Sequence, residues 1–154
     1  ATGQHPMTYC CIDLKPDDFL KFGLLYARQG EWNDTQVVPA SYVRESLSSH
    51  SAFYGYQWWL LNDAYFSSEV PITVCAASGL HGQKIYVWPA ADVVVVVLTQ
   101  YQHFANQGYV LNLSDEGTNF PNTCSARNNC PGSTGSTVPT FDELQLIKLI
   151  DALN

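Results

Sequence analysis

The chain has 154 residues, the length of a single domain with a sizeable core. Its formal net charge is -7 and Lys and Arg form no cluster, which argues against a nucleic acid or an anionic membrane as partner. The longest apolar run has the length of a strand, well short of the roughly 20 residues that a membrane-spanning helix needs.

The five cysteines favour an oxidising compartment. Cys124 and Cys130 bracket a short loop, and we expect a local disulfide between them. One of the adjacent pair Cys10 and Cys11 is expected to reach either Cys75 or a segment outside this chain. The cysteine spacing fits no zinc motif and the four His are scattered, so we expect neither a metal nor a cofactor.

Glycosylation sequons stand at Asn33 and Asn112. Together with the odd cysteine count, they predict a secreted or lysosomal protein of the secretory pathway. The chain begins at Ala1 without an initiator Met, as we expect either of a processed protein or of a segment that starts partway into a longer chain.

After an irregular start over residues 1–14, a helix is predicted to begin at Pro16 and to end at Gly30. Asp17 and Asp18 complement the positive end of its dipole. Its buried face is predicted from the helical spacing of Phe19, Phe22, Gly23, Tyr26 and Ala27. A turn over 31–34 and a shorter helix from Pro39 to about Leu47 follow.

Aromatic and β-branched runs predict the strands, with a turn over 62–64 between the first two. The strands are Tyr54–Leu60, Ile72–Ser78, Gln83–Trp88 and Val93–Thr99. Gly79 and Gly82, between the second and third strands, indicate backbone that lies close to a ligand or to a neighbouring main chain. The predicted fold class is therefore α+β, with an antiparallel sheet flanked by helices.

Residues 100–139 predict an irregular surface excursion rich in Asn, Ser, Thr, Gly and Pro, and residues 140–154 a final helix. Thr140 and Glu143 match a capping box. The buried face of this helix is predicted from Leu146, Leu149, Ile150 and Leu153.

The valine-rich strand over 93–99 is apolar on both faces, which predicts a strand in the interior of its sheet. The strand over 83–88 supplies one neighbour. The other comes either from the strand over 54–60 or from a segment outside the chain, and we favour the second.

Four stretches in order resemble serine beta-lactamase-like hydrolases. They are Asp18–Asn33, Val38–Val43, Tyr54–Trp59 and Ser78–Pro89, the last continuing into the valine strand. The chain is most similar to the C-terminal half of class C beta-lactamase-related esterases and amidases, including the 6-aminohexanoate-dimer hydrolases. The resemblance spans residues 9 to about 100 and the final helix, and implies that residues 1–154 are the C-terminal part of one beta-lactamase-like domain.

The resemblance implies acyl-transfer chemistry. In this family a Ser of S-x-x-K attacks a carbonyl, a Lys and a Tyr move protons, and a K-[ST]-G strand edge flanks the substrate. Ala77, Ser78 and Gly79 align with that edge. Ser78 would hydrogen-bond the substrate, Gly79 would let the backbone approach, and the Leu80 N–H would donate to the oxyanion, a contact worth about 3 kcal/mol of barrier. His81 would contact the substrate, or less favourably act as a general base.

The chain departs from the family pattern in three ways. Ala77 replaces the Lys that binds a carboxylate, which favours a small amide or ester substrate. The sequence contains no S-x-x-K, and no Tyr is followed two residues later by Asn. The nucleophile and the Tyr are therefore expected in a tightly associated N-terminal part of the same precursor. The alternative is a non-catalytic binding or structural module with the same fold.

The sequence leaves two possible roles for each of two further residues. Trp58 is predicted either as a core residue or as a cleft wall that touches the substrate. Ser78 is the less favoured candidate for a nucleophile, because no Lys or other base stands beside it in sequence.

Overall fold

The computed structural model describes residues 12, 14–79, 82–99, 103, 110–112, 137–139 and 142–153. The helices are α1 (Pro16–Ala27), α2 (Ala40–Ser46), α3 (Asp63–Phe66), the 3-10 turn η1 (Pro89–Ala91) and α5 (Glu143–Asp151). The strands are β1 (Glu31–Trp32), β2 (Thr35–Gln36), β3 (Trp59–Leu61), β4 (Val74–Ser78), β5 (Lys84–Trp88), β6 (Val93–Val97), β7 (Val110–Asn112) and β8 (Thr137–Pro139).

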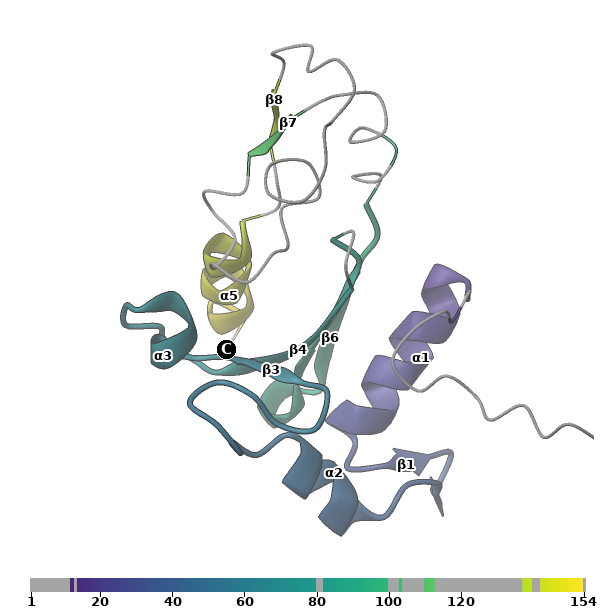
Figure 1. The fold of residues 1–154 in the computed structure, drawn as a ribbon. Coiled ribbons are helices and arrows are strands. Elements are labelled where there is room, and N and C mark those ends of the chain that lie inside the picture. The colour runs from purple at the N-terminus through teal and green to yellow at the C-terminus, as the bar shows by residue number, and fades with distance from the viewer. Residues whose placement is uncertain are drawn as a thin grey trace, which may run out of the picture.

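The centre of the molecule is a four-stranded antiparallel sheet in the order β3-β4-β5-β6. Helix α1 packs on one face and α5 on the other, as Figure 1 shows. The α1 face carries a core that includes Tyr26, Ile85 and Val87, and the α5 face carries a second core that includes Tyr86 and Ile147. The predicted α+β class, an antiparallel sheet flanked by helices, is confirmed at this level.

The structure excludes one of the two neighbours considered for strand β6. This strand pairs with β5, while β3 pairs with β4 at the far side of the sheet, so the strand over 54–60 is not its second neighbour. Within the described part of the chain β6 is an edge strand, and its five valines are only half-buried. Its apolar pattern arises because helices cover both faces of the sheet, with Val94 and Val96 under α1 and the alternate valines in the second core.

Helix α1 begins at Pro16 as predicted, and its close packing depends on Gly23. A Cβ atom at Gly23 would overlap a methyl group of Val94, so only glycine lets the helix approach β6 this closely. The helix is closed by two left-handed residues rather than one, Gln29 (φ 54°) and Gly30 (φ 85°). Phe22 is 43% exposed, so the predicted buried face is narrower than its apolar spacing indicates.

The shorter elements also differ in detail. The predicted turn over 31–34 is a hairpin between β1 and β2, with Asn33 and Asp34 both at positive φ. The predicted turn over 62–64 opens helix α3, because the Asn62 side chain accepts a hydrogen bond from the Tyr65 N–H (3.0 Å) and caps the helix. Strand β3 is shorter than predicted, with Tyr54 contributing isolated bridges.

The final helix is capped by a different residue from the one predicted. Asp142 accepts a hydrogen bond from the Gln145 N–H (2.8 Å), while Glu143 turns into the core instead of closing a capping box. Thr140 lies outside the described residues. The buried face of α5 carries Ile147 and Ile150. Leu149 and Leu153 are 57% and 72% exposed, so their predicted burial is wrong.

Most of the predicted excursion over 100–139, with Cys124 and Cys130, lies outside the described residues. Two of its described pieces, 110–112 and 137–139, form a parallel pair of short strands, β7 and β8. Asn112 is the last residue of β7, and Asn33 is exposed in the β1–β2 turn. None of the described helices is both long and apolar enough to cross a bilayer.

Cys75, on β4, is a buried free thiol rather than a disulfide partner of Cys10 or Cys11. Burial in the α1-face core raises the pKa of this thiol from 9.0 to about 12. Cys10 and Cys11 themselves lie outside the described residues.

Candidate functional site

The candidate site lies where β4 ends and β5 begins. The Gly79 N–H donates to the Gln83 carbonyl (2.8 Å) and the Gly82 N–H donates to the Gly79 carbonyl (3.1 Å), which closes a tight connection between the strands. Gly82 has a φ of 87°, a conformation that favours glycine. Leu80 and His81, the predicted oxyanion donor and its neighbour, lie between them and outside the described residues.

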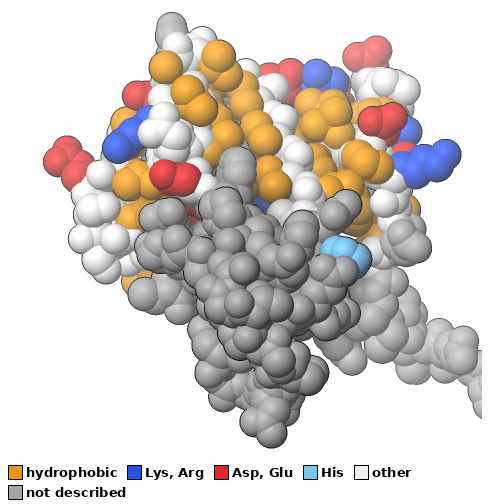
Figure 2. Space-filling model, turned by 90° about the horizontal axis from the view of Figure 1, so that it is seen from above, with side chains coloured by type: hydrophobic (Ala, Val, Ile, Leu, Met, Phe, Trp, Pro, Cys, Tyr) orange, Lys and Arg blue, Asp and Glu red, His pale blue; other side chains and the backbone are white. Residues whose placement is uncertain are grey.

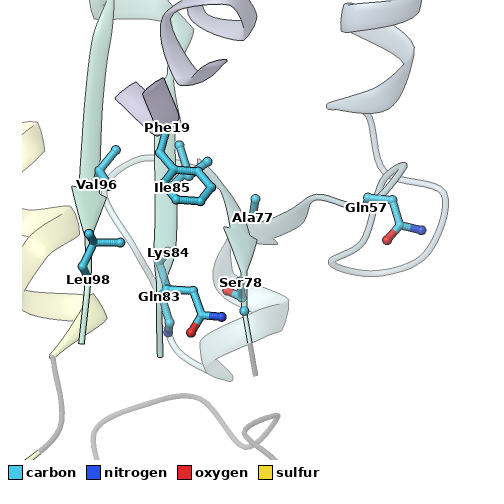
Figure 3. Close-up of a pocket in the computed structure, with 10 residues that line it drawn as sticks. Phe19, Gln57, Ala77, Ser78, Gln83, Lys84, Ile85, Val96 and Leu98 are labelled. Carbon is cyan, nitrogen blue, oxygen red and sulfur yellow. The ribbon is translucent and has the colours of Figure 1, made fainter. Parts of the chain in front are cut away.

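Gly79 shows the close approach that its residue type predicts, because the main chain and the side chain of Gln83 both lie against it. A Cβ atom at this position would collide with the side-chain amide of Gln83, which folds back over the glycine. Figure 3 shows the Gln83 amide beside Ser78 at this end of the sheet.

A pocket of about 220 Å³ opens beside this connection. The three predicted strand-edge residues, Ala77, Ser78 and Gly79, all line it. The other described lining residues come from α1, the loop before β3, and strands β5 and β6 with the segments adjoining them (Figure 3): Phe19, Gln57, Gln83, Lys84, Ile85, Val96 and Leu98.

The alternation of side chains along each strand divides the lining residues between the two faces of the sheet. Ala77, Ile85 and Val96 belong to the α1-face core and form the apolar wall with Phe19. Ser78 follows Ala77 in β4, so its side chain starts from the opposite face. It pairs in register with Lys84 of β5, whose side chain also points to the α5 face.

Lys84 belongs to a buried polar cluster that is centred on Glu143 and joins the sheet to the final helix. Its Nζ donates to Glu143 Oε1 (2.6 Å), and the two side chains are 1% and 0% exposed. Tyr86 Oη donates to the same oxygen (2.8 Å) and Tyr65 Oη donates to Glu143 Oε2 (3.2 Å). The ionised carboxylate thus has a partner on each oxygen, as a buried charge requires.

Sequence reasoning missed this cluster. The one available signal was a lysine inside an otherwise apolar strand, and Glu143 was assigned to a capping box. The register also brings Lys84 opposite Ser78, although no base stands beside Ser78 in sequence. Because the ammonium of Lys84 is engaged by Glu143, we assign Lys84 a structural role and do not pair it with Ser78 as a catalytic base.

Trp58 is a core residue. It is 2% exposed, its ring centroid lies 4.7 Å from that of Tyr26, and it stacks on Phe22. It is not among the described residues that line the pocket, whereas its neighbour Gln57 is. The loop before β3 therefore approaches the pocket through a residue that the sequence did not single out.

Comparison with protein-family models gave no match to this chain, and none of the curated proteins compared with it is similar in sequence. Among the described residues, no three His, Cys, Asp or Glu side chains come together as a metal site would require. The chemistry of the site therefore has to be argued from its own geometry.

Proposed function

We propose that this chain supplies the strand-edge and oxyanion side of a serine hydrolase that cleaves amide or ester bonds through an acyl-enzyme. The nucleophilic serine of an S-x-x-K sequence and the proton-transferring tyrosine come from a tightly associated N-terminal part of the same precursor. The proposal extends the resemblance to beta-lactamase-like esterases and amidases, and it includes a secreted or lysosomal location.

One observation carries the proposal. Ala77, Ser78 and Gly79, the residues aligned with the strand edge that flanks the substrate in that family, border a single pocket at the end of β4. A substrate carbonyl bound there would lie beside Gly79, the last described residue before Leu80. A main-chain N–H aimed at the developing oxyanion typically contributes about 3 kcal/mol.

Each residue of the strand edge has a separate role in this proposal. The Leu80 N–H would be one oxyanion donor, and the amide of the absent nucleophile the other. The Ser78 hydroxyl and His81 would contact the substrate beside the scissile bond. Ala77 would leave the strand edge without the cation that a substrate carboxylate needs, so a neutral amide or ester fits better than a beta-lactam or a peptide carboxylate.

The test is labelling with a fluorescent fluorophosphonate, which reacts with activated serines. The native protein is labelled and then separated by denaturing, reducing electrophoresis beside a measurement of its intact native mass. We expect the label on a second polypeptide or segment, in fixed ratio to these residues. Ser78→Ala should leave this labelled site unchanged, because Ser78 is not the nucleophile.

A native mass equal to this chain alone at 17.1 kDa, with no label, would refute the hydrolase and leave a binding module. Label that moves to these residues and disappears in Ser78→Ala would refute the assignment of the nucleophile. Protein that is boiled before the probe is added serves as the control, because any label that it takes up reflects nonspecific reaction.

A further inference from the structure

The pocket at the end of β4 is built for a small apolar group. Its wall consists of the side chains of Phe19, Ala77, Ile85 and Val96, with Leu98 at the end of β6 (Figure 3). Its volume of about 220 Å³ is below the roughly 300–1,000 Å³ of sites for drug-sized ligands. Figure 2 shows hydrophobic side chains gathered on the part of this face that is not drawn in grey, with most charged side chains toward its margins.

Among the described residues, the polar groups that line the pocket offer no charge to a ligand. Gln57, Ser78 and Gln83 are neutral, and Lys84 is the only ionisable residue among the described residues that line the pocket. The Lys84 ammonium is directed to the other face of the sheet, where it is 1% exposed and bound to Glu143. The pocket thus combines an apolar wall with neutral hydrogen-bonding groups at its edge.

We propose that this pocket binds the uncharged, apolar acyl group of the substrate and discriminates against a carboxylate in the same position. An apolar chain gains free energy by leaving water for this wall. A carboxylate would be desolvated without a countercharge from any described lining residue, which is strongly unfavourable. The identification of the ligand as an acyl group rests on the proposed hydrolase function, whereas the preference for a neutral apolar group rests on the lining residues alone.

The test compares two probes of the same carbon skeleton, pentanamide and pentanoate, in the native protein at neutral pH. Binding is followed by the methyl NMR signals of Ala77, Ile85, Val96 and Leu98. We expect pentanamide to shift these signals in a saturable way, with millimolar affinity, and pentanoate to bind at least tenfold more weakly. This comparison needs no variant, so it does not depend on the folding of a mutant.

Two substitutions locate the site. Val96→Phe places a larger side chain in the pocket and should abolish the shifts caused by pentanamide. Val37→Phe makes the same exchange at a valine that is 58% exposed and does not line the pocket, and should leave binding unchanged.

Equal binding of the two probes, or pentanamide shifts confined to methyl groups outside the pocket, would overturn the proposal. So would a folded protein that labels with fluorophosphonate but does not bind pentanamide, as expected if a side chain of another segment fills the pocket; the hydrolase function would survive that result. Selective pentanamide binding in a protein that takes no fluorophosphonate label would support the pocket and refute the hydrolase.

Discussion

The ion pair between Lys84 and Glu143 connects β5 to α5 across 59 residues of sequence, and removing one partner gives the sharpest test of the fold. In Glu143→Gln the side chain keeps its size but loses its charge, leaving the Lys84 ammonium buried beside a neutral amide. Breaking a buried pair from one side typically costs 3–5 kcal/mol, because the remaining charge is uncompensated. The hydroxyls of Tyr65 and Tyr86 also lose a charged acceptor, so we expect a loss of about 4 kcal/mol.

The assay is equilibrium unfolding in urea, followed by the fluorescence of the four Trp. With a slope of about 2 kcal/mol per molar urea, a loss of about 4 kcal/mol lowers the midpoint by about 2 M. The matched control is Asp92→Asn, which breaks the Arg28–Asp92 bridge (2.8 Å). Both of its side chains are about half exposed, so the midpoint should hardly change.

A double variant separates the pair from its parts. Lys84→Met combined with Glu143→Gln removes both charges, and should be more stable than Glu143→Gln alone because no buried charge is left unpaired. If Glu143→Gln and Asp92→Asn shift the midpoint equally, or if the double variant is no better than the single one, the reasoning about the buried pair is refuted.

Three further predictions concern packing, the thiol and the final helix. Gly23→Ala should lower the free energy of unfolding by about 1–3 kcal/mol, despite the better helix propensity of Ala, because the new methyl group overlaps Val94; unchanged urea unfolding would contradict this. Asp142→Ala should cost about 1 kcal/mol through loss of the cap on the Gln145 N–H, whereas Asp142→Asn should cost little in the same assay. Cys75 should resist iodoacetamide in the native state and react in urea, and its thiol pKa of about 12, against 9.0 for an unburied thiol, should make stability fall as pH rises from 9 to 12. Stability falls because above pH 9 the thiol of the unfolded chain loses its proton while the buried thiol keeps its own. Cys75→Ala should reduce this dependence of the free energy of unfolding on pH, and an unchanged dependence would rule the thiol out as its cause.

Much of the framework was predictable from local sequence. Helix α1 follows from Pro16 and its apolar spacing, and the three strands β4, β5 and β6 follow from runs of mostly apolar residues. The position of β6 was not predictable in this way. A run of five valines indicates that both faces of the strand are covered by apolar groups. Helices on the two faces of the sheet give this cover to an edge strand as well as to an interior one, so the run does not distinguish the two positions.

The candidate site was predictable only in part. Ala77, Ser78 and Gly79 were singled out because they are contiguous and align with a strand-edge pattern, although Ala77 departs from it, and all three line the pocket. Phe19 and Leu98, which complete the pocket, are far apart in sequence and meet only when α1 packs on the sheet. Short local windows cannot encode such pairings.

The inward turn of Glu143 has the same cause. In sequence it stands three residues after Thr140, where a capping box explains it without any distant partner. In the fold, Asp142 takes over the cap and Glu143 meets the only lysine of the central strands. Glu143, Ile147 and Ile150 form the buried face of α5, and Leu149 and Leu153 face outward.

The central claim is that these residues form one side of a serine hydrolase site whose nucleophile lies elsewhere. The most direct measurement is peptide mass spectrometry of the native protein after fluorophosphonate labelling, which identifies the modified serine. The account predicts a serine followed three residues later by lysine, outside these 154 residues. A modified Ser78, or a native protein with no modified serine, would contradict it.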